Sequence, residues 1–359
     1  MTSTSVLTAM ERVCRAAVRT PMLSSAAFDS LVGRTVWIKD ETKQHTGSFK
    51  FRGAYYALAT ATSDQRAAGF ITGSSGNHAQ ALALAALRHD TTATVVIPSD
   101  APASKCVALD ALGAQIITYD RHRDHRDALV QKIAHHTGRS VIPSSNHHGV
   151  IAGAGTVVWE MTQEVPDLVA LFVPIGGGGL AAGSVLAALG HNPQLRVIGV
   201  EPAIANDTHR SLRAGRLTRI PPSDTIADGL RHSEPARLPF EIIKPLIHDV
   251  VTVPEAAIAD AMAYLWRHYS TTAEPSGAVA LAGLLQAAGR LPDGPVGVVA
   301  SGGNVDWPNY RALLDAAIER DRFGTFVGRR GGPVDPRRTV RRRPAPTPRS
   351  RPVASQPST

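Results

Sequence analysis

Short hydrophobic runs alternate with longer amphipathic or small-residue stretches along most of this chain. In the first half, apolar runs predict strands at 36–38, 70–72, 94–97, 115–118 and 140–142, and helical patterns predict helices at 7–19, 54–58, 103–112 and 126–134 and from Ala79 onward. Strands that alternate with helices at this spacing are typical of βαβ units, so the pattern predicts parallel sheets flanked by helices.

The alternation starts again near Ile151. It predicts helices at 154–164, 180–189, 255–268 and 277–288, strands at 168–174, 196–201, 250–253 and 296–300, and a loop-rich segment at 204–222. A chain of 359 residues is long enough for two domains. We therefore expect an α/β protein with two domains.

Composition narrows the class of protein. Hydrophobic residues make up 43% of the chain and charged residues 19%, as in ordinary globular proteins. The N-terminus lacks the pattern of a secretion signal, and no apolar run approaches the roughly 20 residues of a membrane span. Cys14 and Cys106 are isolated, which fits reduced thiols rather than a zinc or disulfide framework. These features predict a cytoplasmic protein with no membrane partner.

The basic charge is confined to the C-terminal end. Residues 327–359 hold nine arginines and one acidic residue, Asp335, which together account for the formal net charge of +8. The rest of the chain is formally neutral, which argues against nucleic-acid binding by the folded part. The segment 327–359 is rich in Pro, Arg, Ser and Thr, and we expect it to be a disordered tail.

Lys50 has an unusual place for a surface charge. It follows a short Gly/Ser turn and lies between two aromatic residues, Phe49 and Phe51, ahead of a helix expected to open near Arg52. A lysine in a partly desolvated pocket is destabilised as the ammonium and becomes an amine nucleophile that forms Schiff bases with aldehydes. The alternative is a solvated lysine at a helix start.

Two other turns follow predicted strands and open predicted helices. Gly176-Gly177-Gly178-Gly179-Leu180 follows the strand at 168–174, and Ser74-Ser75-Gly76-Asn77-His78 follows the strand at 70–72. Such turns present backbone amides at the positive end of a helix dipole, where they bind phosphate or carboxylate groups. The glycine run is neither a Walker A loop nor the spaced dinucleotide fingerprint, and a flexible turn is the alternative.

Together these motifs resemble the fold type II pyridoxal-phosphate enzymes, and within them the threonine dehydratase and serine racemase family. The resemblance runs from about Thr20 to about Asn304 and rests on the ordered motifs Gly-Ser-Phe-Lys-x-Arg-Gly-Ala, Ser-Ser-Gly-Asn-His-x-Gln, Gly-Gly-Gly-Gly-Leu, Val-Glu-Pro, Ala-Asp-Gly, Glu-Pro-Ser-Gly-Ala and Ser-Gly-Gly-Asn. It implies a tryptophan synthase β-like fold with mostly parallel twisted sheets. A large cofactor-binding domain would comprise 1–68 and 144–326, and 69–143 would form a small inserted βα domain.

The resemblance also implies roles for single residues. Lys50 would hold pyridoxal 5'-phosphate as a Schiff base, with Phe49 packed on its ring, Asn77 on the ring hydroxyl and Ser301 facing the pyridine nitrogen. The phosphate would lie on Gly176, Gly177, Gly178, Gly179 and Leu180. The neutral hydroxyl of Ser301 would leave the ring a weak electron sink, which favours expulsion of a β-leaving group.

The resemblance further implies where the substrate binds. Its carboxylate would lie on the backbone amides of Ser74, Ser75, Gly76, Asn77 and His78. Arg126 corresponds to a family arginine near the substrate, with a solvated helix residue as the alternative. Ser75 corresponds to the acid/base of serine racemases, although it could instead cap the following helix. Ala154, the loop at 144–148 and His232 depart from the family pattern, which leaves the substrate open.

A cation site is implied in the same way. Glu201, the carbonyl of Ala205 and Asp207 match the divalent-cation site of the family. Two carboxylates and a carbonyl are hard oxygen ligands suited to Mg²⁺ or Ca²⁺. A helix N-cap is the alternative role of Asp207.

The resemblance thus predicts a pyridoxal-phosphate-dependent serine/threonine dehydratase that catalyses a β-elimination. Lys50 would take the Cα proton, and loss of the β-hydroxyl would give a 2-oxo acid and ammonia. The alternative is a serine racemase or a threo-3-hydroxyaspartate dehydratase that uses Lys50 and Ser75 on opposite faces. A small hydroxy amino acid is the expected substrate, and a homodimer is the expected assembly.

Overall fold

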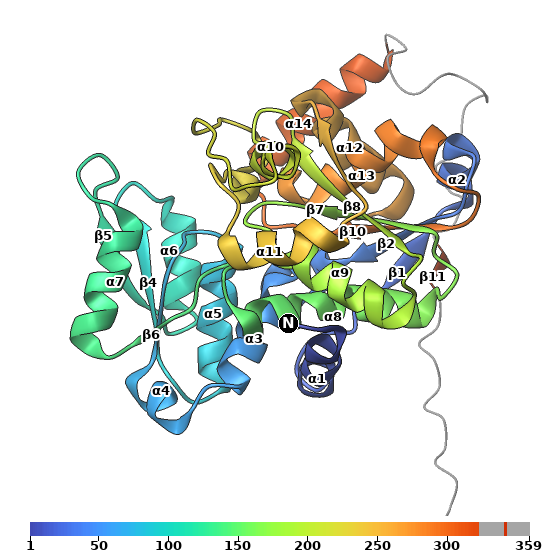
Figure 1. Ribbon diagram of the computed structural model, residues 1–359. Coiled ribbons are helices and arrows are strands. Elements are labelled where there is room, and N and C mark those ends of the chain that lie inside the picture. The colour runs from blue at the N-terminus through green and yellow to red at the C-terminus, as the bar shows by residue number, and fades with distance from the viewer. Residues whose placement is uncertain (323–340, 343–359) are drawn as a thin grey trace, which may run out of the picture.

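The computed structural model describes residues 1–322 and 341–342, and its strands form two sheets (Figure 1). The strands are β1 (Met22–Ser24), β2 (Val36–Asp40), β3 (Phe70–Gly73), β4 (Ala93–Pro98), β5 (Gln115–Tyr119), β6 (Ser140–Val141), β7 (Ala170–Pro174), β8 (Arg196–Pro202), β9 (Asp249–Val253), β10 (Val296–Ala300) and β11 (Arg341–Arg342). One sheet has the order β11-β1-β2-β10-β7-β8-β9, and the other has the order β5-β4-β3-β6.

The prediction of mostly parallel sheets is confirmed. Strands β2, β10, β7, β8 and β9 pair in parallel, as do all four strands of the smaller sheet, and only β1 and β11 add antiparallel pairs among the described residues. In the middle of the larger sheet, Val298 of β10 lies opposite both Ile38 and Phe172. These strands read as continuous apolar runs because both faces of the sheet are covered.

Helices cover both faces of the larger sheet and surround the smaller one. The α-helices are α1 (Ser3–Val13), α2 (Ala26–Val32), α3 (Lys50–Ala59), α4 (Ser63–Ala68), α5 (Asn77–Arg88), α6 (Ala103–Asp110), α7 (Arg126–Thr137), α8 (His148–Glu164), α9 (Gly179–His191), α10 (Asp207–Ala214), α11 (Arg237–Leu246), α12 (Glu255–Tyr269), α13 (Pro275–Ala287) and α14 (Trp307–Arg322). Short 3₁₀ helices are η1 (Glu41–Lys43), η2 (His45–Gly47), η3 (Asp228–Leu230) and η4 (Ala288–Arg290).

Alternate side chains of the strands build a core on each face of the larger sheet. Phe172 of β7 belongs to the core shared with α12 and α13, whereas its neighbours Leu171 and Val173 belong to the core shared with α8 and α9. Figure 1 shows α12, α13 and α14 above this sheet and α8 and α9 below it, with α1 alongside. The smaller sheet lies to one side, among α5, α6 and α7.

Three predicted segments differ from the structure. The helix predicted at 7–19 ends at Val13. Beyond it, the amide (2.9 Å) and the carbonyl (2.8 Å) of Val18 bind the side chain of Gln44 instead of continuing a helix. The segment predicted as a loop at 204–222 contains α10. Lys50, expected in the turn before a helix, is instead the first residue of α3.

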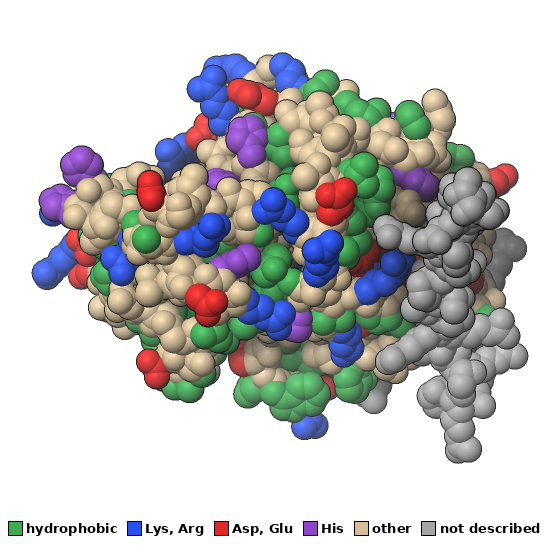
Figure 2. Space-filling model, turned by 90° about the horizontal axis from the view of Figure 1, so that it is seen from below, with side chains coloured by type: hydrophobic (Ala, Val, Ile, Leu, Met, Phe, Trp, Pro, Cys, Tyr) green, Lys and Arg blue, Asp and Glu red, His purple; other side chains and the backbone are tan. Residues whose placement is uncertain are grey.

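The predicted tail at 327–359 falls almost wholly outside the described residues. Its described part is Arg341–Arg342, which forms β11 and pairs antiparallel with β1, and the disorder of the rest stays a prediction. Figure 2 shows basic, acidic and hydrophobic side chains interspersed over the described part of one face. Among the described residues, no helix is long and apolar enough to cross a membrane.

A buried cluster of four charges fixes α3 in place. Arg52 makes two hydrogen bonds to Glu41 (2.8 and 2.8 Å) and two to Glu160 (2.7 and 2.9 Å). Lys39 of β2 adds an ion pair to Glu160 at 2.7 Å. All four side chains are buried, and their charges cancel. Burial alone would lower the pKa of Arg52, but Glu41 and Glu160 raise it above its usual value.

This cluster, which we call the ion quartet (Lys39, Glu41, Arg52 and Glu160), ties together four elements. Lys39 comes from β2, Glu41 from η1, Arg52 from α3 and Glu160 from α8. Forked pairing of a guanidinium with two carboxylates is directional, so it fixes the rotation of α3 as well as its distance from α8. Because Arg52 lies two residues after Lys50, the quartet also fixes the start of α3.

Replacement of Arg52 by alanine should destabilise the fold strongly. Removal of one partner leaves buried charges without compensation, and we expect the free energy of unfolding to fall by roughly 3–5 kcal/mol. Urea unfolding followed by circular dichroism measures this. The control is Arg311→Ala, an exposed arginine whose nearest carboxylate, Asp315, is 3.8 Å away, and it should cost about 1 kcal/mol or less. Equal effects of both variants would contradict the role of the quartet.

Candidate functional site

The candidate site lies where loops after the strands of both sheets meet. The segment before Lys50 pairs with the segment after β10: Ser48 forms a bridge with Gly302, and the amide of Phe49 donates to the carbonyl of Ser301 (3.0 Å). In open α/β sheets, ligands bind at the carboxyl ends of the strands. The structure therefore brings Phe49, Lys50 and Ser301 together from distant parts of the sequence.

The amine of Lys50 is held in a partly dry environment. Its Nζ donates to the carbonyl of Ser144 (3.0 Å) and lies 5.0 Å from the centre of the Phe49 ring. Burial lowers the pKa of Lys50 to about 8, although the nearby carboxyl of Glu274 acts in the opposite direction. With this pKa, roughly a tenth of the amine is neutral at pH 7, far more than for an ordinary lysine, and the neutral form is the one that acts as nucleophile or general base.

Asn77, the first residue of α5, is oriented from two sides. Its Nδ2 donates to Glu274 (2.6 Å), and its Oδ1 accepts from Nδ2 of Asn304 (2.8 Å). A side chain added at Gly302 would collide with Glu274 and Ser48, so these segments are in close contact. Burial, followed by the charge of Asp228, raises the pKa of Glu274 to about 8.

The glycine run forms a turn into α9, and we call Gly176–Gly179 the glycine cradle. Gly178 has φ of +85° and precedes the first residue of α9, where a Cβ would be strained. A Cβ on Gly177 would meet the hydroxyl of Ser145 and lie 3.1 Å from Nε2 of His232. The cradle therefore presents backbone rather than side chains at the positive end of α9, as an anion site requires.

The loop from Ser74 to His78 joins β3 to α5. Gly76 is the N-cap of α5 and supplies no side-chain cap, so the alternative prediction that Ser75 caps this helix is wrong. His78 is buried and donates from Nε2 to the carbonyl of Ile142 (2.9 Å). Burial and the charge of Lys50 lower its pKa to about 3, so His78 is neutral.

Arg126 is the first residue of α7, and its stem lies against Gly73 at the end of β3. Its guanidinium pairs with Asp127 at 2.8 Å and is about half exposed. It is close enough to lower the pKa of His232. Arg126 therefore lies near the site, on the side of the smaller sheet. Its role as a substrate contact stays a prediction.

The predicted cation ligands lie at the end of β8, at the start of α10. The carboxylate of Glu201 accepts the amides of Thr208 (3.0 Å) and His209 (2.8 Å) and so caps α10. Both carboxylate oxygens of Asp207 are buried and have no partner among the described residues. Burial and Asp207 raise the pKa of Glu201 to about 8, and burial with Glu234 raises that of Asp207 to about 7.

The described residues contain no cluster of three or more His, Cys, Asp and Glu side chains arranged to hold a metal. A cation at Glu201 and Asp207 would need further oxygen ligands, such as the carbonyl of buried Ala205. The pKa values of Glu201 and Asp207 are nevertheless raised, as expected for two buried carboxyl groups that have no cation between them.

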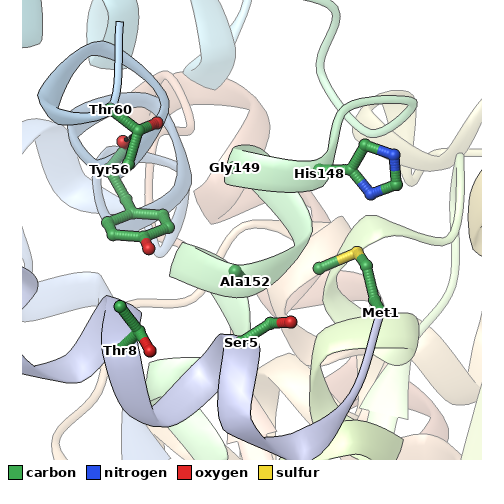
Figure 3. Close-up of a pocket in the computed structure, with 8 residues that line it drawn as sticks. All are labelled: Met1, Ser5, Thr8, Tyr56, Thr60, His148, Gly149 and Ala152. Carbon is green, nitrogen blue, oxygen red and sulfur yellow. Dashed lines mark hydrogen bonds between the residues drawn. The ribbon is translucent and has the colours of Figure 1, made fainter.

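A surface pocket of about 550 Å³ lies elsewhere, between α1, α3 and α8. Figure 3 shows Ser5 and Thr8 of α1 on one side, Tyr56 of α3 and the C-cap Thr60 on the other, and His148 and Met1 at one end. It includes none of the predicted site residues. We therefore assign the candidate site to the strand ends around Lys50 and not to this pocket.

Sequence reasoning did not single out Glu274, Asn304 and His232 as members of this site. Glu274 and Asn304 belong to motifs that were recognised, Glu-Pro-Ser-Gly-Ala and Ser-Gly-Gly-Asn, so position within a motif could have marked them. In the sequence, His232 stands out only as a departure from the family pattern. Its place beside the glycine cradle follows from the path of the chain after η3, which no local pattern reveals.

This mostly parallel fold, with a half-buried lysine amine beside a glycine cradle, fits an enzyme that holds a phosphate-bearing aldehyde cofactor. The family model described as "Pyridoxal-phosphate dependent enzyme" matches residues 13–302. The chain belongs to this family, and its cofactor is pyridoxal phosphate.

Relatives of this chain carry three different functional names. It is 39% identical to the L-threo-3-hydroxyaspartate ammonia-lyase of Saccharomyces cerevisiae over 86% of this chain and 95% of the relative. It is also 39% identical to the serine racemase of Schizosaccharomyces pombe, over 86% of this chain and 96% of the relative. The solved structure of the processed form of threonine deaminase isoform 2 from Solanum lycopersicum superposes with a TM-score of 0.83, 30% identity, and coverage of 88% and 93%.

The residues present fit the cofactor. The cradle offers backbone amides where a Cβ would find no room, and Lys50 offers an amine of lowered pKa. Asn77 is held in a fixed orientation by Glu274 and Asn304. The side chains that lie against the cradle are those of Ser145, His232, Pro239 and Ile243, and none of them is acidic, so they are compatible with a phosphate there.

The lowered pKa of Lys50 predicts how cofactor uptake depends on pH. Only the neutral amine attacks an aldehyde, so uptake of pyridoxal phosphate by the apoenzyme should speed up about tenfold per pH unit below pH 7 and level off above about pH 8. Stopped-flow absorbance measures the rate, with Nα-acetyl-lysine as the reference amine. A rate that still rises tenfold per unit between pH 9 and 10 would mean that Lys50 is an ordinary solvated lysine.

Proposed function

We propose that this chain is an ammonia-lyase that eliminates the β-hydroxyl of a small hydroxy amino acid, of the serine/threonine type, as water. Hydrolysis of the released enamine by water then yields a 2-oxo acid and ammonia. The observation that carries the proposal is the half-buried Lys50 amine, of lowered pKa, beside Asn77 and the glycine cradle. Bound pyridoxal phosphate supplies the electron sink that makes the Cα proton removable. The residues of the chain supply binding, orientation and proton transfer.

The residues of the site have distinct roles in this proposal. Lys50 would anchor the cofactor, and its neutral amine would also remove the Cα proton of the substrate. The amides at the start of α5, whose cap Gly76 adds no side chain, would receive the substrate carboxylate. Asn77 and Phe49 would position the ring of the cofactor, Ser301 would contact its nitrogen, and residues 176–180 would hold its phosphate.

A second candidate function is amino-acid racemisation, and one observation favours it. Gly76, not Ser75, is the N-cap of α5, so the hydroxyl of half-buried Ser75 is not needed to begin the helix. A hydroxyl on the face opposite Lys50 would return a proton with inversion. The relatives named serine racemase agree with this alternative, as those named L-threo-3-hydroxyaspartate ammonia-lyase agree with a 3-hydroxyaspartate dehydratase.

A panel of substrates separates these functions. The purified holoenzyme is incubated with L-serine, L-threonine, D-serine and threo-3-hydroxyaspartate, and both 2-oxo acid release and substrate chirality are followed. We expect 2-oxo acid from L-serine or L-threonine, and at least a thousandfold loss with Lys50→Ala, which also loses the visible absorbance of the bound cofactor. D-serine formed from L-serine faster than pyruvate, and abolished by Ser75→Ala, would establish the racemase instead.

We also propose that Glu201, the Ala205 carbonyl and Asp207 bind Mg²⁺ or Ca²⁺. The support is the pair of unpartnered carboxylate oxygens of Asp207, buried next to Glu201. A cation that binds only the folded state raises its stability. We expect millimolar Mg²⁺ or Ca²⁺ to raise the melting temperature of the protein by several degrees, and EDTA to reverse this. Asp207→Ala should lose the response, and a response that persists in this variant would contradict the site.

We also propose a domain division, an assembly and a cellular location for this protein. Residues 69–143 contain every strand of the smaller sheet, which supports their assignment as an inserted small domain between the parts 1–68 and 144–326 of a larger one. We expect a homodimer, to be checked by light scattering. We expect the protein to be located in the cytoplasm.

A further inference from the structure

His232 lies against the glycine cradle, and the proposed reaction assigns it no task. It follows η3, in the segment that leads to α11. Its Nδ1 is 3.1 Å from the place that a Cβ on Gly176 would occupy, and its Nε2 is 3.1 Å from the corresponding place on Gly177. The imidazole edge therefore faces both glycines, and only the absence of side chains there lets it come so close.

The side chain of His232 carries a polar atom that the fold does not satisfy. Its Nδ1 is enclosed and has no hydrogen-bond partner within the described part of the chain. The carbonyl of Leu230 accepts the backbone amide of His232 at 2.8 Å and also acts on the ring, where it opposes the lowering of the pKa. It does not form a hydrogen bond with Nδ1. An enclosed polar atom without a partner costs free energy unless a ligand satisfies it.

The charges around His232 favour an anion. Lys50 of α3 and Arg126 of α7 both act on the ring, and together with burial they lower its pKa to about 4. The cradle adds the positive end of the α9 dipole, and the other side chains that lie against it, those of Ser145, Pro239 and Ile243, are uncharged. Even the neutral imidazole keeps one N–H donor, and a donor to an anionic oxygen forms a strong hydrogen bond.

We propose that His232 donates a hydrogen bond to the phosphate group of bound pyridoxal phosphate, as a side-chain ligand beside the backbone amides of the cradle. This inference rests on the proposed assignment of the cradle as the phosphate site. It makes His232 a determinant of cofactor affinity rather than a surface residue of the loop after η3. The contact is to the phosphate alone, so its loss is specific for cofactors that carry that group.

Pyridoxal, which lacks the phosphate, is the probe that isolates this contact. Apparent dissociation constants of pyridoxal phosphate and pyridoxal are measured by absorbance titration of the apoenzyme, for the wild type and for His232→Ser. We expect His232→Ser to weaken pyridoxal phosphate binding about ten- to hundredfold and to leave pyridoxal binding within about twofold. The exposed His122 supplies the matched control, His122→Ser, which should change neither constant.

Inorganic phosphate gives a second readout that does not depend on Lys50. It should compete with pyridoxal phosphate for the wild-type apoenzyme, and the competition should weaken in His232→Ser by a similar factor. If the serine variant does not fold, judged by its melting curve, His232→Asn takes its place under the same criterion.

The outcomes distinguish the inference from the proposed function. Equal weakening of both cofactors, or unchanged pyridoxal phosphate binding, would overturn the role of His232. A change confined to the KM of the amino-acid substrate would also overturn it and place the imidazole on the substrate side. A wild-type apoenzyme that gains no visible absorbance with pyridoxal phosphate would refute the proposed function itself.

Discussion

The site depends on the ion quartet beneath it. Four charged side chains without access to water can be tolerated only because each meets an opposite charge in good geometry, with Arg52 bonded to both carboxylates. That requirement fixes β2, η1, α3 and α8 relative to one another. Lys50 and Arg52 share the first turn of α3, so the same geometry that satisfies the arginine also aims the lysine at the strand ends.

Arg52 and Lys50 lie in one short segment but have different roles, one structural and the other chemical. The charge of Arg52 is fully paired, and its pKa is raised by Glu41 and Glu160 despite burial. Lys50 has a carbonyl, from Ser144, as its hydrogen-bond partner, and burial lowers its pKa to about 8. Neighbouring cations thus have opposite shifts because one is surrounded by carboxylates and the other is not.

Much of the fold and of the candidate site could be predicted because the signals are local. Apolar runs mark the parallel strands, and the turns at 74–78 and 176–180 each follow a strand and open a helix, as the sequence spacing indicates. Predictions failed where distant residues decide local structure. The backbone of Val18 binds the side chain of Gln44 where the sequence indicated a helix, and the carboxylate of Glu201 caps a helix where the sequence indicated a loop.

The α/β alternation, the lysine between two aromatic residues, the glycine run and the family could be predicted from the sequence, because each depends on consecutive residues. The folded structure was needed to show that Arg52 is a structural charge, that Glu274 and Asn304 orient Asn77, and that His232 faces the glycine cradle. The reason is physical. Burial, pairing of charges and approach of a ring to a backbone turn depend on residues separated by tens to hundreds of positions in the chain.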